Sequence, residues 1–225
     1  ESKQGYQSAY EYMRRIAGGK LAFSLVEKLA YYYSDTGQKE AARHCFRELI
    51  EERPLAPKAF DYQYQIVNHY VFSTKDSVLK TELMRWIDDF GPKGAWHRAN
   101  AENVQLVKDA EKVRESTLRN YVLQMHQTAK NSRQATSENA AWEGYVLYIK
   151  SFPDSAQLDL MQFYFGELLF DMKKYDLAAK QYAWIIKNRP KSSYAEPAVI
   201  NSTIAFEKAL PSEKEMKERM GSTTK

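Results

Sequence analysis

The sequence predicts an all-α protein in which paired helices stack into an α–α superhelix, with one extended helix in the middle. Four of the seven prolines each close a stretch of helix-forming residues: Pro54, Pro92, Pro153 and Pro190. Proline ends a helix because it lacks the backbone N–H and clashes with the preceding turn. Apolar residues recur at helical spacing inside each stretch. The 16 tyrosines against 9 glycines also favour packed helices over turn-rich sheets.

The four stretches match one another when they are aligned backwards from their prolines, which indicates an internal repeat. A small residue recurs at one offset, as Ala42, Ala141 and Ala178. A small residue where helices cross lets their axes approach to about 8–10 Å, and a large neighbour fills the groove beside it. The large apolar residue one turn later is Phe46, Met84, Tyr145 or Tyr182.

We expect one domain over residues 1–210, in which these helix pairs form the repeats. The expected repeats span about 23–56, 57–93, 94–154 and 157–191. A stack of repeats needs a terminal helix that covers its last apolar face, and residues 194–210 suit that role. The inward-facing residues of this capping helix are expected to be Ala198, Ile200, Ile204, Ala205 and Leu210.

The interval between Pro92 and Pro153 is longer than the others and carries an insertion. Residues 95–133 contain no glycine or proline. We therefore expect one long helix here, or two helices broken near Arg114, that acts as the first helix of the third repeat. Two interpretations stay open for the part that overshoots its neighbours, a spacer or a docking element for a partner.

Both ends of the chain indicate a piece of a longer protein. Residues 5–17 suit the second helix of an earlier repeat, and the chain begins at Glu1 without a visible signal peptide. Residues 211–225 are charged and polar, and we expect them to form a frayed tail.

Two segments, 23–54 and 159–190, resemble a tetratricopeptide repeat (TPR). The matching residues are Leu29, Ala30, Tyr33, Gly37, Ala42, Phe46 and Pro54, and then Phe165, Gly166, Leu169, Tyr175, Ala178, Tyr182 and Pro190. The resemblance implies a right-handed solenoid whose first helices line a concave groove that binds a protein segment. The repeat ending at Pro92 is degenerate, because Lys80 stands where the small residue belongs.

Residues 142–199 are similar to TPR proteins of the bacterial cell envelope. The shared features are a helix ending in "YIKSFPDS" and a following helix that contains "YFGELL". The similar proteins include the outer-membrane assembly lipoprotein of this repeat type, periplasmic division coordinators and gliding-motility proteins. This implies a place in the periplasm or cell envelope of a Gram-negative bacterium, with the cytoplasm as the alternative.

The TPR resemblance also implies which side chains face the concave groove. Many of them are aromatic, which is typical of a partner site, although packing on the adjacent repeat is the other interpretation. The set lacks the Lys and Arg clamp with which family members hold a C-terminal carboxylate, so we do not expect that mode. The residues are Glu27, Tyr31, Ser34, Tyr62, Gln65, His69, Phe72, Leu160, Phe163, Glu167 and Phe170.

No residue pattern predicts catalysis, a metal site or a cofactor. The histidines lie far apart without ligand spacing, and no glycine-rich phosphate loop is present. The net charge of +4 comes from mixed charges, which argues against a nucleic-acid partner, and no apolar run is long enough to span a membrane. We therefore expect a non-catalytic protein–protein interaction scaffold. The alternatives are a structural spacer and a regulatory domain of a larger protein.

Overall fold

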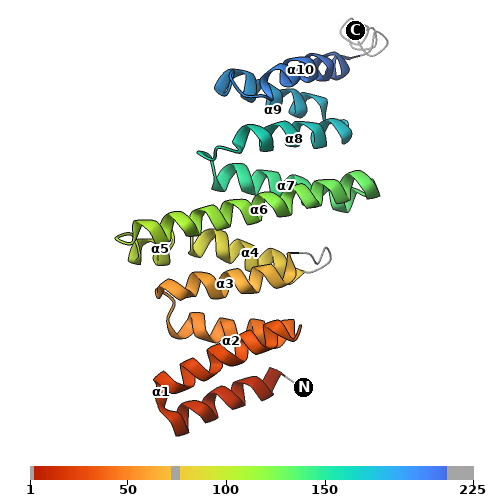
Figure 1. Ribbon diagram of the computed structural model, residues 1–225. Helices are drawn as coiled ribbons and strands as arrows, with labels where there is room; N and C mark the ends of the chain where they lie inside the picture. The colour runs from red at the N-terminus through yellow and green to blue at the C-terminus, as the bar shows by residue number, and fades with distance from the viewer. Residues whose placement is uncertain (1–2, 72–76, 212–225) are drawn as a thin grey trace, which may run out of the picture. The chain divides into compact units, whose positions relative to one another are not determined.

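The structure is a computed structural model that describes residues 3–71 and 77–211, and within these ranges it contains helices and no strand (Figure 1). The predicted all-α class is confirmed. None of the helices in these ranges is long and apolar enough to cross a membrane. The helices are α1 (Lys3–Asp35), α2 (Lys39–Glu52), α3 (Pro57–Tyr70), α4 (Ser77–Asp89), α5 (Ala95–Ala99), α6 (Val104–Ser132), α7 (Ala135–Ser151), α8 (Leu158–Asp171), α9 (Tyr175–Asn188) and α10 (Ala195–Ala209).

The chain divides into two compact units, Glu1–Arg114 and Glu115–Lys225, with the boundary inside α6. In the first unit, α1 packs on α2, α2 on α3 and α3 on α4. A kink divides α1 at Gly18, where φ is 76° and ψ is 159°. Glycine adopts this conformation because it has no Cβ. The residues before the kink include 5–17, which the sequence assigns to the second helix of an earlier repeat.

Burial in the first unit agrees with most of the repeat pattern. Ala42 and Phe46 are fully buried on α2. On α4 the pattern assigns the large inward residue to Met84, and this prediction is wrong, because Met84 is 38% exposed. Leu83 and Trp86 are buried instead. Ile87, which the pattern also assigns to the inward face, is buried, so the register of α4 agrees with the pattern at Ile87 and not at Met84.

A buried carboxylate joins three helices of the first unit. The side chain of Glu82 on α4 is only 2% exposed and forms ion pairs with Arg43 and Arg47 on α2. Its Oε2 also accepts a hydrogen bond of 3.1 Å from the amide of Gln63 on α3. A buried charge is tolerated when it is paired and hydrogen-bonded in this way.

The long middle helix begins later than expected and does not break near Arg114. The segment 95–133 instead divides at residues 100–103, between α5 and α6. Asn100 donates its side-chain amide to the carbonyls of Leu55 and Trp96, each at 2.9 Å. The side chain of Asn103 accepts a hydrogen bond of 3.1 Å from the backbone N–H of Leu106 and so caps α6. Asparagine side chains compete with the helix for backbone partners, which explains a break without glycine or proline.

In the second unit, α7 packs on α8, α8 on α9 and α9 on α10, so that these helices follow one another in layers (Figure 1). The paired small and large residues lie where the pattern predicts, since Ala141, Tyr145, Ala178 and Tyr182 are fully buried. A Cβ added to Gly166 on α8 would lie 2.5 Å from Cε1 of Tyr182 on α9. Glycine thus permits the close approach of these two helices.

The terminal helix α10 presents a narrower buried face than predicted. Ala198 and Ala205 are fully buried, as expected. Ile200, Ile204 and Leu210 are 55%, 39% and 70% exposed, so the prediction that they face inward is wrong. The reason is that α10 packs on α9 through one narrow stripe of small residues. The predicted tail lies almost entirely outside the described residues, which end at Pro211.

Candidate functional site

Two adjoining cavities lie between α6 and α8 in the second unit. The first, of about 370 Å³, is lined by His126, Ala129, Lys130, Arg133, Glu138, Leu168, Asp171 and Lys173. The second, of about 300 Å³, is lined by Leu123, His126, Gln127, Lys130, Tyr164 and Glu167. Because His126 and Lys130 line both cavities, we treat them as one site and call it the α6–α8 groove.

Helical spacing places the lining residues on one face of each helix. Leu123, His126 and Lys130 follow one another on α6 at intervals of one helical turn. Tyr164, Leu168 and Asp171 do the same on α8. The two rows therefore face each other across the groove.

His126 lies where the two cavities meet. Its side chain is almost fully buried, and its Nδ1 lies 2.7 Å from the hydroxyl of Tyr145. Burial lowers the pKa of His126, the charge of Lys130 lowers it further, and Asp171 opposes this shift only in part. The imidazole is therefore neutral near pH 7 and acts as a hydrogen-bonding group rather than as a cation.

Glu167 is held at the edge of the groove by two neighbours. It accepts a hydrogen bond of 2.5 Å from the hydroxyl of Tyr182 on α9 and one of 2.8 Å from the amide of Asn201 on α10. Burial and this bond to Glu167 raise the pKa of Tyr182. The carboxylate is thus oriented by the helices that follow, which fixes this side of the groove.

An aromatic cluster adjoins the groove. Tyr164 is 38% exposed, and its ring lies against those of Phe163 at 5.9 Å and Tyr194 at 6.3 Å between centroids. Phe163 also packs on Tyr194 at 5.1 Å and on Tyr182 at 5.6 Å. Aromatic side chains that are partly exposed beside a cavity are typical of sites that bind protein segments.

The predicted groove residues of the second unit lie in different surroundings. Glu167 lines the groove. Phe163 is half-buried in the aromatic cluster, and Leu160 is also half-buried. Phe170 is half-buried as well and packs edge-on against Tyr175 at 5.1 Å, with the ammonium of Lys208 5.8 Å from its centroid. For Phe170, packing on the following helices therefore explains the aromatic residue.

In the first unit, the side chains of Tyr62 and Glu27 contact each other and are used in packing within the unit. Tyr62 is 1% exposed, and its hydroxyl donates a hydrogen bond of 2.7 Å to Glu27. The Lys58 ammonium donates another of 2.7 Å to the same carboxylate. Burial alone raises the pKa of Glu27, but these two hydrogen bonds outweigh it and lower the pKa overall. The expectation that Tyr62 faces a partner is corrected by its burial.

The other predicted residues of the first unit are only partly accessible. Tyr31 is 36% exposed and contacts the ring of Phe46 edge-on at 5.2 Å. Ser34, Gln65 and His69 are half-buried. Phe72 lies outside the described residues.

The α6 side of the groove is absent from the predicted set, although a signal for it is present in the sequence. Leu160, Phe163, Glu167 and Phe170 stand at four fixed offsets before Pro190. The same offsets before Pro153 select residues that all line the groove: Leu123, His126, Lys130 and Arg133. The insertion between Pro92 and Pro153 interrupts the period of the repeat, which conceals this register.

The groove offers binding chemistry, with apolar surface, hydrogen-bonding groups and charges of both signs. Among the described residues, no group of three or more His, Cys, Asp or Glu side chains is arranged to hold a metal ion. Cys45 lies in the other unit and is buried. Burial and the nearby Glu48 raise the pKa of its thiol to about 12, so it is protonated near pH 7.

Comparison with known proteins gives no family assignment. No protein-family model matches the chain, and no curated protein matches it at a significant level.

Proposed function

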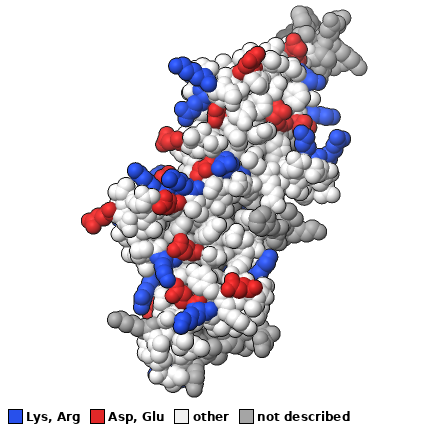
Figure 2. Space-filling model, in the orientation of Figure 1, with Lys and Arg blue, Asp and Glu red and all other residues white. Residues whose placement is uncertain are grey.

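We propose that this chain is a non-catalytic protein–protein interaction scaffold whose α6–α8 groove takes up a segment of a partner protein. One observation carries the proposal: two adjoining cavities lie between neighbouring helices and combine apolar, aromatic and charged walls. Sites of this composition orient a bound chain through a few polar groups while apolar contacts supply affinity. On the face drawn in Figure 2, Lys and Arg are interspersed with Asp and Glu, a distribution that suits a protein partner better than nucleic acid.

We further propose that the helix pairs form a right-handed TPR solenoid. The support is the recurrence of buried small and large residues at the same offsets before Pro54, Pro153 and Pro190. The offsets of Leu160, Phe163, Glu167 and Phe170 before Pro190 select, before Pro153, three residues of α6 and the adjoining Arg133, all of which line the groove. The similarity of residues 142–199 to envelope TPR proteins supports a role in a bacterial envelope complex.

The proposal is tested by pull-down from envelope extract with a variant that alters only the groove. Gln127→Arg and Tyr164→Ala, made together, change two exposed lining residues. Removal of an aromatic contact at the centre of an interface weakens binding by about tenfold or more. We therefore expect specific partners of the wild type to be lost while the helical circular dichroism spectrum is retained.

The matched control is Val146→Ala, which truncates a side chain that is 47% exposed on α7 and does not line the groove. It should retain every partner. If the groove variant retains them as well, partner binding is located elsewhere on the chain and the proposal is wrong.

A further inference from the structure

The first cavity of the groove contains three basic side chains that form no ion pair with any described acidic residue. Lys130, Arg133 and Lys173 all line it. In the described part of the chain, none of the three has a carboxylate oxygen within 4 Å. Glu138 and Asp171 line the same cavity without pairing with them. The three cations are therefore available to a bound group.

Two of these cations occupy backbone positions that suit glycine. Arg133 has φ of 52° and Lys173 has φ of 59°, and no other described non-glycine residue has a positive φ. Arg133 directly follows α6 and Lys173 follows α8 after Met172, in turns where glycine is the usual residue because it lacks a Cβ. A strained residue of this kind is a reason to look for function.

The turn itself does not require a cation. Gly37 with φ of 75° follows α1 in the same way. Its N–H donates to the carbonyl of Ser34 at 3.1 Å, and the N–H of Lys173 donates to that of Phe170 at 2.9 Å, three residues back in each case. The two turns thus share their hydrogen bonding, and glycine satisfies it with less strain than lysine.

The charge balance indicates a single anionic group as the ligand. Three cations and two carboxylates line the cavity, and the neutral His126 forms one wall. This small positive excess suits one carboxylate better than a polyanion, which would be repelled by Glu138 and Asp171. The adjoining cavity offers Leu123 and Tyr164 as apolar surface, and its one carboxylate, Glu167, already accepts hydrogen bonds from Tyr182 and Asn201.

We propose that Lys130, Arg133 and Lys173 bind the side-chain carboxylate of an acidic residue in a partner segment, with a neighbouring apolar residue of that segment in the second cavity. This inference rests on the proposed function and specifies the class of partner. Charge-assisted hydrogen bonds from lysine and arginine hold the carboxylate, and Arg133 can bind both of its oxygens.

A structural explanation of the cations predicts a different result from the same variant. Basic residues after a helix stabilise its negative end. If that is their role, the double variant Arg133→Gly, Lys173→Gly has a lower melting temperature and binds acidic ligands as the wild type does. If they bind a carboxylate, the glycines relieve backbone strain, the melting temperature is unchanged or higher, and acidic ligands are lost.

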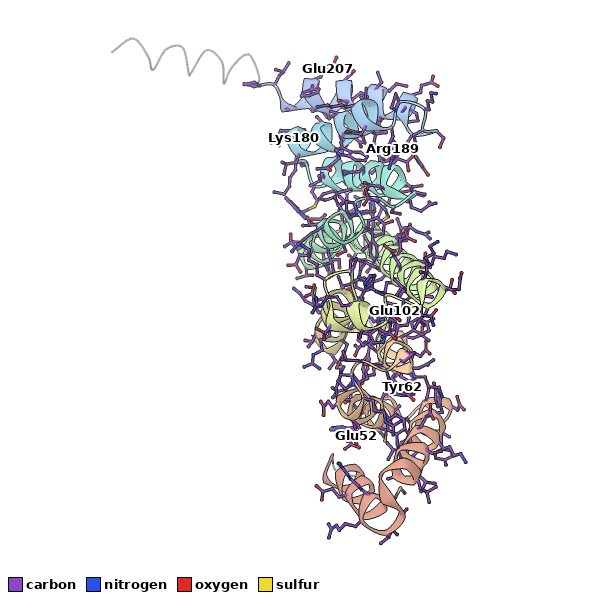
Figure 3. All side chains as sticks on the ribbon, turned by 90° about the vertical axis from the view of Figure 1, so that its left-hand side faces the viewer. Glu52, Tyr62, Glu102, Lys180, Arg189 and Glu207 are labelled. Carbon is purple, nitrogen blue, oxygen red and sulfur yellow. The ribbon has the colours of Figure 1, made fainter. Side chains whose placement is uncertain are left out.

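The test uses short random peptides displayed on phage, attached so that no peptide has a free C-terminal carboxylate. They are selected on the wild-type chain, and the enriched peptides are then synthesised and titrated against each variant. We expect enrichment of an acidic residue beside an apolar one, and about tenfold weaker binding to the Arg133→Gly, Lys173→Gly variant. The control Lys180→Gln, Lys187→Gln removes the same charge from α9, on which Figure 3 labels Lys180, and should bind like the wild type.

The outcomes separate this inference from the proposed function. The enriched peptides could bind the Gln127→Arg, Tyr164→Ala variant more weakly than the wild type and yet show no preference for acidic residues. That result would overturn the carboxylate site and support the groove as the place of binding. Acidic peptides that bind the Arg133→Gly, Lys173→Gly variant as tightly as the control Lys180→Gln, Lys187→Gln would also overturn the carboxylate site. If no peptide is enriched, or if the enriched peptides bind the Gln127→Arg, Tyr164→Ala variant as tightly as the wild type, both proposals fail. Inorganic phosphate that displaces the peptides equally from wild type and control would indicate a general anion site and would count against the side-chain carboxylate.

Discussion

His126 lines both cavities of the α6–α8 groove, and its surroundings make the stability of the second unit depend on pH. The ring contacts Tyr145 and Tyr164, and the charges of Asp171 and Lys130 act on its pKa in opposite directions. Burial lowers its pKa below the ordinary value of 6.5, so the folded chain binds this proton less readily than the unfolded chain. Stability from this residue is therefore complete above pH 6.5 and is lost as the pH falls through its folded pKa.

We predict that replacement of His126 by glutamine weakens this pH dependence. The amide retains a hydrogen-bonding group near Tyr145 but does not titrate. Urea unfolding at about pH 7.5 and about pH 5.5 measures the free energy of unfolding of both proteins. The wild type should lose more stability on acidification than the variant, and His69, whose pKa is also lowered by burial, contributes equally to both. Equal losses would show that His126 titrates normally.

At the scale of elements, close contact between paired helices depends on a few small residues. Gly166 on α8 faces the ring of Tyr182 on α9, and Gly144 on α7 faces Val122 on α6, where an added Cβ would lie 2.9 Å from Cγ2. Contacts below 3.0 Å force a shift of one partner. The Tyr182 ring is fully buried and its hydroxyl is bound to Glu167, so it cannot move freely.

We predict that Gly166→Ala destabilises the second unit by about 1–3 kcal/mol, the usual effect of overpacking. The gain in helix propensity, about 1 kcal/mol, offsets part of this loss. Gly19→Ala is the matched control, because an added Cβ at Gly19 meets nothing within 4 Å. It should leave stability unchanged or raise it. A Gly166→Ala protein as stable as the wild type in urea would show that α8 and α9 can separate at little cost.

Sequence patterns predict the elements well where a proline and a small residue mark each repeat, because both act locally. The burial of Ala42, Phe46, Ala178 and Tyr182 follows from that pattern. The start of α6 does not, because it depends on a hydrogen bond from Asn100 to the distant carbonyl of Leu55. Residues that contact a helix far along the chain set such boundaries, and a single sequence does not reveal them.

At the scale of the whole molecule, the candidate site was predicted less well than the fold. Of the predicted residues, Glu167 lines the groove, whereas Tyr62 is buried, with its ring packed on Phe23 and Phe46. Repeat position indicates which side of a helix a residue occupies, but not whether a neighbouring helix covers it. The cations Arg133 and Lys173 are absent from the predicted set. Arg133 has the repeat offset of Phe170, but the insertion before Pro153 obscures the period there, and Lys173 lies in the turn after α8, which the groove offsets do not include.

The most direct test of the scaffold function is site-specific photo-crosslinking in the cell that makes the protein. A photoreactive residue replaces Gln127, which is exposed and lines the groove, and in a second protein it replaces Lys180 on α9. We expect a defined protein adduct at position 127 that Tyr164→Ala removes, and none of the same mass at position 180. Absence of any adduct at position 127, or the same adduct at both positions, would contradict the scaffold function.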